Sequence, residues 1–323
     1  MKAIVQDTYG STDVLQFRVV DRPEIADDEV LVRVHAAGVD RGVWHLMTGL
    51  PYPIRLAGYG VRAPKNGVPG MDVAGQVEAV GKDVTRFQPG DEVFGIGKGT
   101  FAEYARAPEN KLAPKPANLT FEQAAVVAIS GLTALQGLRD HGRVQPGQKV
   151  LIIGASGGVG TYAVQLAKAF GAQVTGVCST TKVDMVRSLG ADHVIDYTRD
   201  DFADRGQRYD LILDIGGNSS LARLRRVLTP RGKLVIVGGE TGGRWLGGTD
   251  RQIRALLLSP FVSQKMGTFI SRENHEDMLV LKELIEAGKV TPAIDRTYPL
   301  TEAPQAIEYL QQGHARGKVL ITV

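Results

Sequence analysis

A short glycine-rich segment carries the clearest chemical signal in the chain. It reads Gly154-Ala-Ser-Gly-Gly-Val-Gly160, after the aliphatic run Val150–Ile153 and before a helical pattern over Thr161–Phe170. Glycines placed in this way let the backbone approach a pyrophosphate, and the last one lets the helix lie close to the strand. The helix N-terminus offers N–H groups and positive partial charge to phosphate oxygens. The residues expected to contact a dinucleotide are Ser156, Gly157, Gly158 and Val159.

An ordinary turn between a strand and a helix can also be rich in glycine, so the surrounding pattern decides between the two interpretations. The run Val174–Cys178 follows the helical pattern, and its composition predicts the next strand. Strand, turn, helix and strand together form the context in which this spacing indicates dinucleotide binding.

The end of that second strand indicates which nicotinamide cofactor is bound. Domains that prefer NAD place an acidic residue there, about 20 residues after the glycine turn, to bind the ribose 2′-hydroxyl. Here the strand runs into Cys178-Ser-Thr-Thr-Lys182, and the first carboxylate is Asp184. A hydroxyl and an ammonium can hold a 2′-phosphate, which an acid would repel. The sequence therefore predicts NADPH; the alternative for Lys182 is a solvated lysine in the first turn of a helix.

Length and composition place the chain among globular proteins of about two domains. It has 323 residues, 43% hydrophobic and 23% charged, and a net charge of +3 that argues for neither nucleic acid nor a membrane surface. Its one cysteine, Cys178, excludes an intrachain disulfide and a multi-cysteine zinc site, and no activating base lies near it in the sequence. Without an apolar run typical of a membrane span or signal peptide, we expect a cytoplasmic enzyme.

Two patterns of secondary structure follow one another along the chain. In the first third, alternating apolar and polar residues predict strands over Lys2–Gln6, Glu29–Gly38 and Asp72–Val80. The long irregular loop over Leu46–Pro69 is typical of a functional segment. From Thr120 onward helices appear, and strands then alternate with helices, which predicts a doubly wound parallel sheet. The expected elements are Val150–Ile153, Thr161–Phe170, Val174–Cys178, Lys182–Leu189, His193–Ile195, Leu211–Ile215, Leu221–Leu228, Lys233–Val237, Met266–Ile270, His275–Ala287 and Lys318–Val323.

Several short motifs are spread in order along the whole chain. They are Gly38-Val-Asp40, Gly70-Met-Asp-Val-Ala-Gly75, Phe87-Gln-Pro-Gly-Asp-Glu-Val-Phe94, Gly99-Thr-Phe-Ala-Glu-Tyr104, Gly154–Gly160, Leu189-Gly-Ala-Asp-His-Val-Ile-Asp-Tyr197 and Gly317-Lys-Val. Together they resemble the medium-chain dehydrogenase/reductase superfamily, in particular its zinc-independent quinone oxidoreductase-like branch. The resemblance implies an α/β fold: a partly barrel-like, GroES-like catalytic domain over residues 1–121 and 271–323, and an inserted NADP-binding Rossmann domain over residues 122–270. The active site would be the cleft between the two domains.

The positions that hold catalytic zinc in alcohol dehydrogenases of this superfamily match Asp40, Met71 and Ile129. Methionine and isoleucine cannot replace the imidazole and thiolate of such a site. The four-cysteine lobe of the structural zinc is also missing from the sequence. We therefore predict that both zinc sites are absent, which disfavours the alternative of a zinc alcohol dehydrogenase.

The resemblance also implies roles for single residues. Quinone reductases of this kind hold the 2′-phosphate with a serine, a lysine and a tyrosine, which match Ser179, Lys182 and Tyr197. The other positions matched to cofactor binding are Arg41, Thr133, Gly238 and Lys318. His45 matches a proton-relay histidine of the zinc enzymes, but that relay serves a metal alkoxide.

The predicted reaction follows from an intact cofactor motif without zinc. The cofactor supplies hydride, and an acceptor whose negative charge delocalises, a quinone or an α,β-unsaturated carbonyl, needs only hydrogen-bond donors near its oxygen. The candidate catalytic residues are Asp40, His45 and Tyr52. Alternatively, His45 is a hydrogen-bonded wall residue, and Trp44 and Tyr52 pack in the core.

Two other functions remain open on the sequence: a carbonyl or alcohol oxidoreductase of alcohol dehydrogenase type, and a low-turnover NADPH-binding sensor or structural protein. An edge strand over Met266–Ile270 could pair with its counterpart in a second copy, so we also expect a homodimer.

Overall fold

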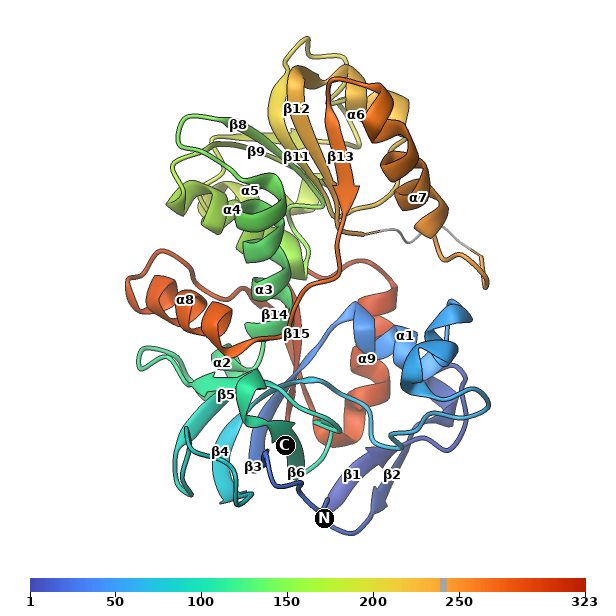
Figure 1. Cartoon of the computed structure of the whole chain (residues 1–323), viewed down its shortest axis with the longest axis vertical. Helices are drawn as coiled ribbons and strands as arrows, with labels where there is room; N and C mark the ends of the chain where they lie inside the picture. The colour runs from blue at the N-terminus through green and yellow to red at the C-terminus, as the bar shows by residue number, and fades with distance from the viewer. Residues whose placement is uncertain (239–242) are drawn as a thin grey trace. The chain divides into compact units, whose positions relative to one another are not determined.

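The computed structural model describes residues 1–238 and 243–323, and it divides the chain into two compact units (Figure 1). The first unit consists of Met1–Leu132, Glu273–Gly288 and Pro292–Val323, and the second of Thr133–Arg272 and Lys289–Thr291. Within the described residues, no helix has both the length and the apolar character to cross a membrane.

The second unit is built on a six-stranded parallel sheet with the order β10-β9-β8-β11-β12-β13. Numbered along the chain, this is the 3-2-1-4-5-6 order of the Rossmann fold. Its strands are β8 (Lys149–Ile153), β9 (Gln173–Cys178), β10 (His193–Asp196), β11 (Tyr209–Asp214), β12 (Leu228–Ile236) and β13 (Lys265–Thr268). The connecting helices are α4 (Gly158–Ala169), α5 (Val183–Ser188), α6 (Leu221–Arg226) and α7 (Thr249–Leu258). The predicted doubly wound parallel sheet is therefore confirmed.

Helices cover both faces of this sheet, because the strand order reverses direction between β8 and β11. In Figure 1, α4 and α5 lie on one face, and α6 and α7 lie on the other. Strands covered on both faces must be apolar throughout, and Val150, Leu151 and Ile152 of β8 are fully buried.

The first unit contains a two-stranded sheet and a seven-stranded sheet. In the larger sheet, six strands follow the order β14-β15-β3-β4-β5-β7, and the seventh, β6, also pairs with β3. The strands are β1 (Lys2–Val5), β2 (Gln16–Val19), β3 (Glu29–Val39), β4 (Asp72–Val80), β5 (Glu92–Ile96), β6 (Tyr104–Pro108), β7 (Leu112–Pro114), β14 (Ile294–Pro299) and β15 (Lys318–Thr322). β15 pairs antiparallel with β3, with Val319 opposite Val39. The C-terminal segment thus completes the N-terminal β domain, as expected.

The α-helices outside the parallel sheet are α1 (Arg41–Thr48), α2 (Phe121–Ala124), α3 (Ala128–Gln136), α8 (His275–Glu286) and α9 (Ala303–Gln311), and a short π-helix, η2, spans Arg55–Tyr59. α1 is held in place by the core of the first unit, where Val43 and Met47 are buried in one cluster with Ile307 of α9 and Ile321 of β15. This packing fixes the helix that follows Asp40.

Some predicted boundaries were wrong. The helix predicted over Leu221–Leu228 ends at Arg226, and Leu228 instead begins β12, where it lies opposite Tyr209 of β11. A register shift after that pair lengthens the strand at its start. An apolar run before a turn cannot by itself distinguish a helix end from a strand start.

Candidate functional site

The glycine turn of the second unit joins β8 to α4 at the point where the strand order reverses, which is where doubly wound sheets bind ligands. Gly154 has a φ of +86°, a conformation that favours glycine. A Cβ atom on Gly160 would lie 2.1 Å from the carbonyl oxygen of Gly154, so only glycine lets α4 lie against the turn. Gly157 caps α4 with extended backbone, and a Cβ atom there would be 3.7 Å from its nearest neighbour. The turn therefore has the geometry of a phosphate-binding loop, because the first N–H groups of a helix lack partners within it.

The three residues predicted to hold a 2′-phosphate come together at the ends of β9 and β10. Ser179 follows β9 directly, and its carbonyl oxygen accepts from the backbone N–H of Lys182 at 2.9 Å. The backbone N–H of Tyr197 donates to the carbonyl oxygen of Cys178 at 3.1 Å, and its side chain is 63% exposed. A serine hydroxyl, an ammonium and an accessible phenol can all donate to a phosphate.

The structure adds a carboxylate that the sequence order did not reveal. Asp196 ends β10 and lies opposite Cys178 in the parallel pairing. Its Oδ2 accepts from Oγ1 of Thr180 at 2.6 Å, and its Oδ1 accepts from Oγ1 and N of Thr198 at 2.7 and 3.0 Å. These hydrogen bonds, the one from Thr180 above all, lower the pKa of Asp196. An anion therefore lies beside the Ser179–Lys182 turn, and only the strand register would have predicted it.

Cys178 is buried, and its thiol is poorly suited to nucleophilic chemistry. Burial raises its pKa to about 11, and the charge of Asp196 adds to the shift. This environment agrees with the lack of an activating base near Cys178 in the sequence.

Gly238 lies two residues after the end of β12 and close to Ile215, which follows β11 directly. A Cβ atom there would lie 2.1 Å from the carbonyl oxygen of Ile215. Arg251 of α7 holds this region together: its Nη1 lies 2.5 Å from Oδ2 of the fully buried Asp214, and its Nη2 donates to the carbonyl oxygen of Gly238 at 3.1 Å. These contacts of Arg251 had little signal in the sequence, since Arg251 lies on a helix that was not predicted.

At the start of the second unit, Thr133 donates through Oγ1 to Oγ of Ser271 at 3.3 Å.

In the first unit, Asp40 caps α1. Its Oδ1 accepts from the backbone N–H groups of Gly42 and Val43 at 2.6 and 3.3 Å. Its Oδ2 is buried and finds no hydrogen-bond partner among the described residues. Burial raises the pKa of Asp40 to about 6; the positive charge of Lys318 opposes that rise and the negative charge of Asp72 adds to it. Asp40 is therefore a buried carboxyl group that can take up or release a proton near neutral pH.

The predicted zinc positions carry a donor set that does not fit zinc. A Cβ atom on Gly42 would lie 2.8 Å from Oδ1 of Asp40 and 3.0 Å from Cε of Met71, so the carboxylate and the thioether methyl lie side by side. The backbone N–H of Ile129 donates to Oδ1 of Asp72 at 2.9 Å. Over residues 1–238 and 243–323, no three His, Cys, Asp or Glu side chains gather as a metal site.

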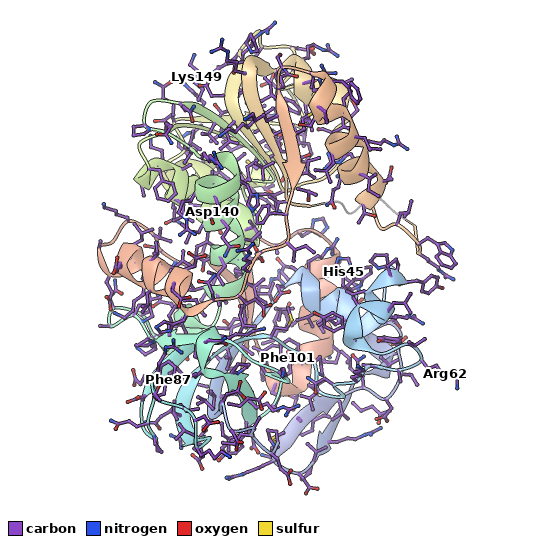
Figure 2. All side chains as sticks on the ribbon, in the orientation of Figure 1. His45, Arg62, Phe87, Phe101, Asp140 and Lys149 are labelled. Carbon is purple, nitrogen blue, oxygen red and sulfur yellow. The ribbon has the colours of Figure 1, made fainter. Side chains whose placement is uncertain are left out.

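His45, labelled in Figure 2, lies in the last turn of α1 with Nδ1 2.8 Å from the carbonyl oxygen of Leu50. A carbonyl can only accept, so Nδ1 carries the proton and Nε2 of the neutral ring is an acceptor. Neutral His45 therefore cannot donate to a substrate oxygen, and only the imidazolium could. Trp44 is half-buried and packs against the core, with the Arg41 guanidinium 5.6 Å from its ring centroid.

Tyr52 and Lys318 complete the predicted set. Tyr52 follows α1, is half-buried, and has the guanidinium of Arg55 4.9 Å from its ring centroid. Lys318 is 2% exposed and donates through Nζ to Oδ2 of Asp72 at 2.8 Å. The contribution of Arg55 was missed, because nothing in the sequence separates it from other loop arginines.

Comparison with known proteins places these features in a family. Residues 26–117 match the family described as alcohol dehydrogenase GroES-like domain, and residues 189–321 match the family described as zinc-binding dehydrogenase. A mitochondrial NAD(P)H oxidoreductase of Mus musculus is 34% identical over 361 residues, covering 100% of this chain and 89% of that protein. A chloroplastic NADPH-dependent alkenal/one oxidoreductase of Arabidopsis thaliana is 33% identical, covering 99% of this chain and 79% of that protein.

Comparison with solved structures supports the same family. The quinone oxidoreductase of Coxiella burnetii superposes with a TM-score of 0.88 at 30% identity, covering 100% of this chain and 99% of that one. Similarity in sequence and in fold thus extends along the full length of the chain. The chain therefore belongs to the medium-chain dehydrogenase/reductase superfamily, in its quinone oxidoreductase-like branch, and is an oxidoreductase.

Proposed function

We propose that this enzyme transfers hydride from NADPH to a quinone or an α,β-unsaturated carbonyl, without zinc. The observation that carries the proposal is the combination of a well-formed dinucleotide turn at Gly154–Gly160 with Asp40, Met71 and Ile129 at the zinc positions. The names of the relatives, which include quinone, alkenal/one and NADPH-dependent oxidoreductases, support the same acceptors and cofactor.

We assign NADPH to the Rossmann unit, residues 122–270 in the sequence-based division, and the acceptor to the GroES-like unit. The N-terminus of α4 receives the pyrophosphate, and Ser179, Lys182 and Tyr197 receive the 2′-phosphate. Further cofactor contacts are assigned to Arg41, Thr133, Ser156, Gly157, Gly158, Val159, Gly238 and Lys318. NADPH supplies the hydride when it is bound, and the protein supplies binding, orientation and hydrogen bonds.

On the acceptor side, the protein must stabilise the negative charge that develops on the carbonyl oxygen. Tyr52 is the neutral donor of the candidate set, because the neutral ring of His45 offers an acceptor at Nε2. His45 and Asp40 are assigned to holding protons: His45 accepts at Nε2, and Asp40 titrates near neutral pH. Loss of one oxyanion donor costs on the order of 10²-fold in rate, so Tyr52→Phe should lower turnover far more than it changes the KM for NADPH.

The deciding experiment is steady-state oxidation of NADPH with a panel of small quinones and conjugated enones, beside NADP⁺ with simple alcohols. We expect turnover with at least one quinone or enone, little with alcohols, and no change after prolonged chelator treatment. Tight NADPH binding without turnover of either acceptor class would support the low-turnover binding protein instead. About one zinc per purified chain together with alcohol oxidation would support the alcohol dehydrogenase alternative.

A comparison of Tyr52→Phe with His45→Ala then tests the assignments. Tyr52→Phe removes a donor and keeps the ring that contacts Arg55, and His45→Ala removes the acceptor at Nε2 and the bond to Leu50. If both variants keep full turnover at saturating NADPH, the donor is another residue.

We also propose a homodimer located in the cytoplasm. β13 is the last strand of its sheet, and the neighbouring α7 and its continuation carry exposed apolar side chains that a second copy would cover. They are Ile253, Leu256, Leu257 and Phe261, with exposed fractions of 50%, 49%, 66% and 85%. Light scattering over a range of concentrations tests the dimer, with Leu257→Asp as the dissociating variant, and cell fractionation tests the location.

A further inference from the structure

We propose that Arg55 is a positioning residue: it fixes the segment Tyr52–Gly60 against α1 and so presets the acceptor site of the first unit. The inference rests on the proposed function, because it concerns the segment that carries Tyr52. It adds a residue that neither the motifs nor the resemblance singles out. Its support is a set of four contacts made by the Arg55 side chain; one of the contacted residues, Tyr9, also holds the far end of the segment.

The first anchor is the C-terminal end of α1. Arg55 donates from Nε to the carbonyl oxygen of Gly49 at 2.9 Å and from Nη2 to that of Thr48 at 3.4 Å. The last carbonyl groups of a helix have no partners within it and carry negative partial charge. The guanidinium therefore satisfies these groups and meets a favourable field.

The second anchor is aromatic. The guanidinium carbon of Arg55 lies 4.4 Å from the ring centroid of Tyr9 and 4.9 Å from that of Tyr52, and both distances are within the range of cation–π contact. The two rings come from parts of the chain more than 40 residues apart in sequence, so the contact is tertiary. It holds the ring of Tyr52 at a defined place beside α1.

Glycine at position 49 makes this arrangement possible. Gly49 has a φ of +62°, and a Cβ atom there would lie 2.7 Å from both Nε of Arg55 and Cδ1 of Tyr9. Any side chain at this position would displace the guanidinium or the ring. Gly49, the Arg55 guanidinium and the Tyr9 ring therefore pack closely at one point, which indicates a specific contact between α1 and the segment.

Tyr9 holds the far end of the segment. Its hydroxyl lies 3.0 Å from the carbonyl oxygen of Tyr59 and 2.6 Å from that of Gly60. The segment Tyr52–Gly60 is thus held against α1 and Tyr9 at three places: Tyr52, Arg55 and Gly60. His45 lies on α1, and its Nδ1 contacts the carbonyl oxygen of Leu50, just before the segment. Both candidate catalytic residues, Tyr52 and His45, therefore lie on the parts of the chain that Arg55 joins.

The contacts require arginine. Two donors of one planar guanidinium reach two carbonyl groups while its central carbon lies over two rings. A lysine ammonium offers neither the plane nor the fork. Arg55→Lys should therefore behave like Arg55→Gln, and keeping the charge should not rescue function. Arg62 is a matched control, since it is an exposed arginine on the same stretch of chain, at the outer margin of the first unit (Figure 2).

The kinetic test measures KM and kcat for a quinone and KM for NADPH in four proteins: the unmodified enzyme, Arg55→Lys, Arg55→Gln and Arg62→Gln. Because misplacing substrate-positioning groups by about 1 Å is costly, we expect the acceptor KM to rise on the order of tenfold in both Arg55 variants. The KM for NADPH and the behaviour of Arg62→Gln should stay unchanged. Full function in Arg55→Lys, or equal losses for acceptor and NADPH, would overturn the proposal.

A second readout needs no cofactor. Within this segment chymotrypsin can cleave after Leu56 and Tyr59, whereas Pro53 blocks cleavage after Tyr52. The contacts of Arg55 should slow cleavage at Leu56 and Tyr59 in the unmodified protein. We expect several-fold faster cleavage within this segment in Arg55→Gln, and no acceleration in Arg62→Gln. Equal cleavage rates in the unmodified protein and in Arg55→Gln would contradict the anchoring of the segment by Arg55, even if the kinetic constants changed. If the enzyme reduces no quinone or enone but the cleavage difference is found, the proposed function is wrong, while the anchoring of the segment by Arg55 is supported.

Tyr9→Phe keeps the test open should the Arg55 variants fail to fold. It keeps the ring that contacts Arg55 and removes only the hydroxyl bonds to Tyr59 and Gly60. The same rise in acceptor KM, with faster cleavage near Tyr59, is expected to a smaller extent. Unmodified behaviour in both measurements would contradict the role assigned to the segment.

Discussion

Nζ of Lys318 lies 2.8 Å from Oδ2 of Asp72, and the two side chains are 2% and 0% exposed. The pair joins β15, near the C-terminus, to β4, in the N-terminal third of the chain. The remaining oxygen of Asp72 accepts from the backbone N–H of Ile129. A Cβ atom on Gly38 would lie 2.7 Å from Oδ2 of Asp72, so glycine in β3 makes room for the carboxylate. The ion pair is therefore a structural link within the first unit as well as a neighbour of Asp40.

Breaking that pair from one side should be costly. Removing one partner of a buried ion pair leaves an uncompensated charge and costs about 3–5 kcal/mol, so Lys318→Met should lower the free energy of unfolding by that amount. The double variant with Asp72→Asn removes the stranded charge and should recover a large part of the loss. Urea unfolding of the three proteins measures both, and equal stability of the single and double variants would contradict the argument.

Asp40 should make stability depend on pH. Its pKa of about 6 lies above the ordinary value of 3.8, so the folded protein holds this proton more tightly than the unfolded chain. The stabilisation is fully present below the ordinary pKa and is lost as pH rises through the folded one. Compared with Asp40→Asn, which keeps an oxygen to cap α1 and does not titrate, the unmodified protein should lose on the order of 2–3 kcal/mol between about pH 4 and 7. A pH-independent difference between the two in urea unfolding would refute the shift.

Gly157 and Gly160 should respond differently to alanine. At Gly160 the new methyl would meet the carbonyl oxygen of Gly154 at 2.1 Å, and forced overpacking costs about 1–3 kcal/mol or more. At Gly157 the backbone is extended and the methyl has room, so stability should stay within about 0.5 kcal/mol of the unmodified protein. Gly157→Ala should nevertheless weaken NADPH binding, because the methyl would face the phosphate. Thermal unfolding and calorimetric titration separate the two effects, and similar stability losses in both variants would be inconsistent with the turn geometry.

Lys182 and Asp196 should move cofactor preference in opposite directions. Lys182→Ala should weaken NADPH by about 1.5–3 kcal/mol, the range for a charged hydrogen bond, and should leave NADH almost unchanged. Asp196→Asn removes the anion beside the Ser179–Lys182 turn, so it should strengthen NADPH binding and leave NADH as it was. Calorimetry with both cofactors, and with 2′,5′-ADP as a fragment, measures the preference. Equal affinity of the unmodified protein for NADPH and NADH would count against the assigned 2′-phosphate site.

Strong local patterns made the second unit predictable. The strand, turn, helix and strand around Gly154–Gly160 lie within a few residues of their predicted places, since buried aliphatic strands and a glycine spacing are both local signals. α1 was missed because its eight residues include one glycine and precede another, a composition that favours a loop. α7 was missed because it is amphipathic over only ten residues after a glycine-rich stretch.

The site was less predictable than the fold, because several of its contacts depend on tertiary packing. Asp196 reaches the Ser179 turn only through the register of β10 on β9. Arg55 gains its role from rings at Tyr9 and Tyr52, and Arg251 gains its role from a buried carboxylate on another strand. The tautomer of His45 depends on a carbonyl that only the folded loop brings to it.

The antiparallel pairing of β15 with β3 has a consequence for how the protein is made. A ribosome synthesises all six strands of the parallel sheet before it reaches β14 and β15. Until the last strand emerges, one edge of β3 has no partner over Ala36–Val39 and Lys318 cannot reach Asp72. The whole parallel sheet of the second unit is thus available while the β sheet of the first unit still lacks β14 and β15. The chain must therefore keep an open strand edge of β3 protected until β15 has been synthesised.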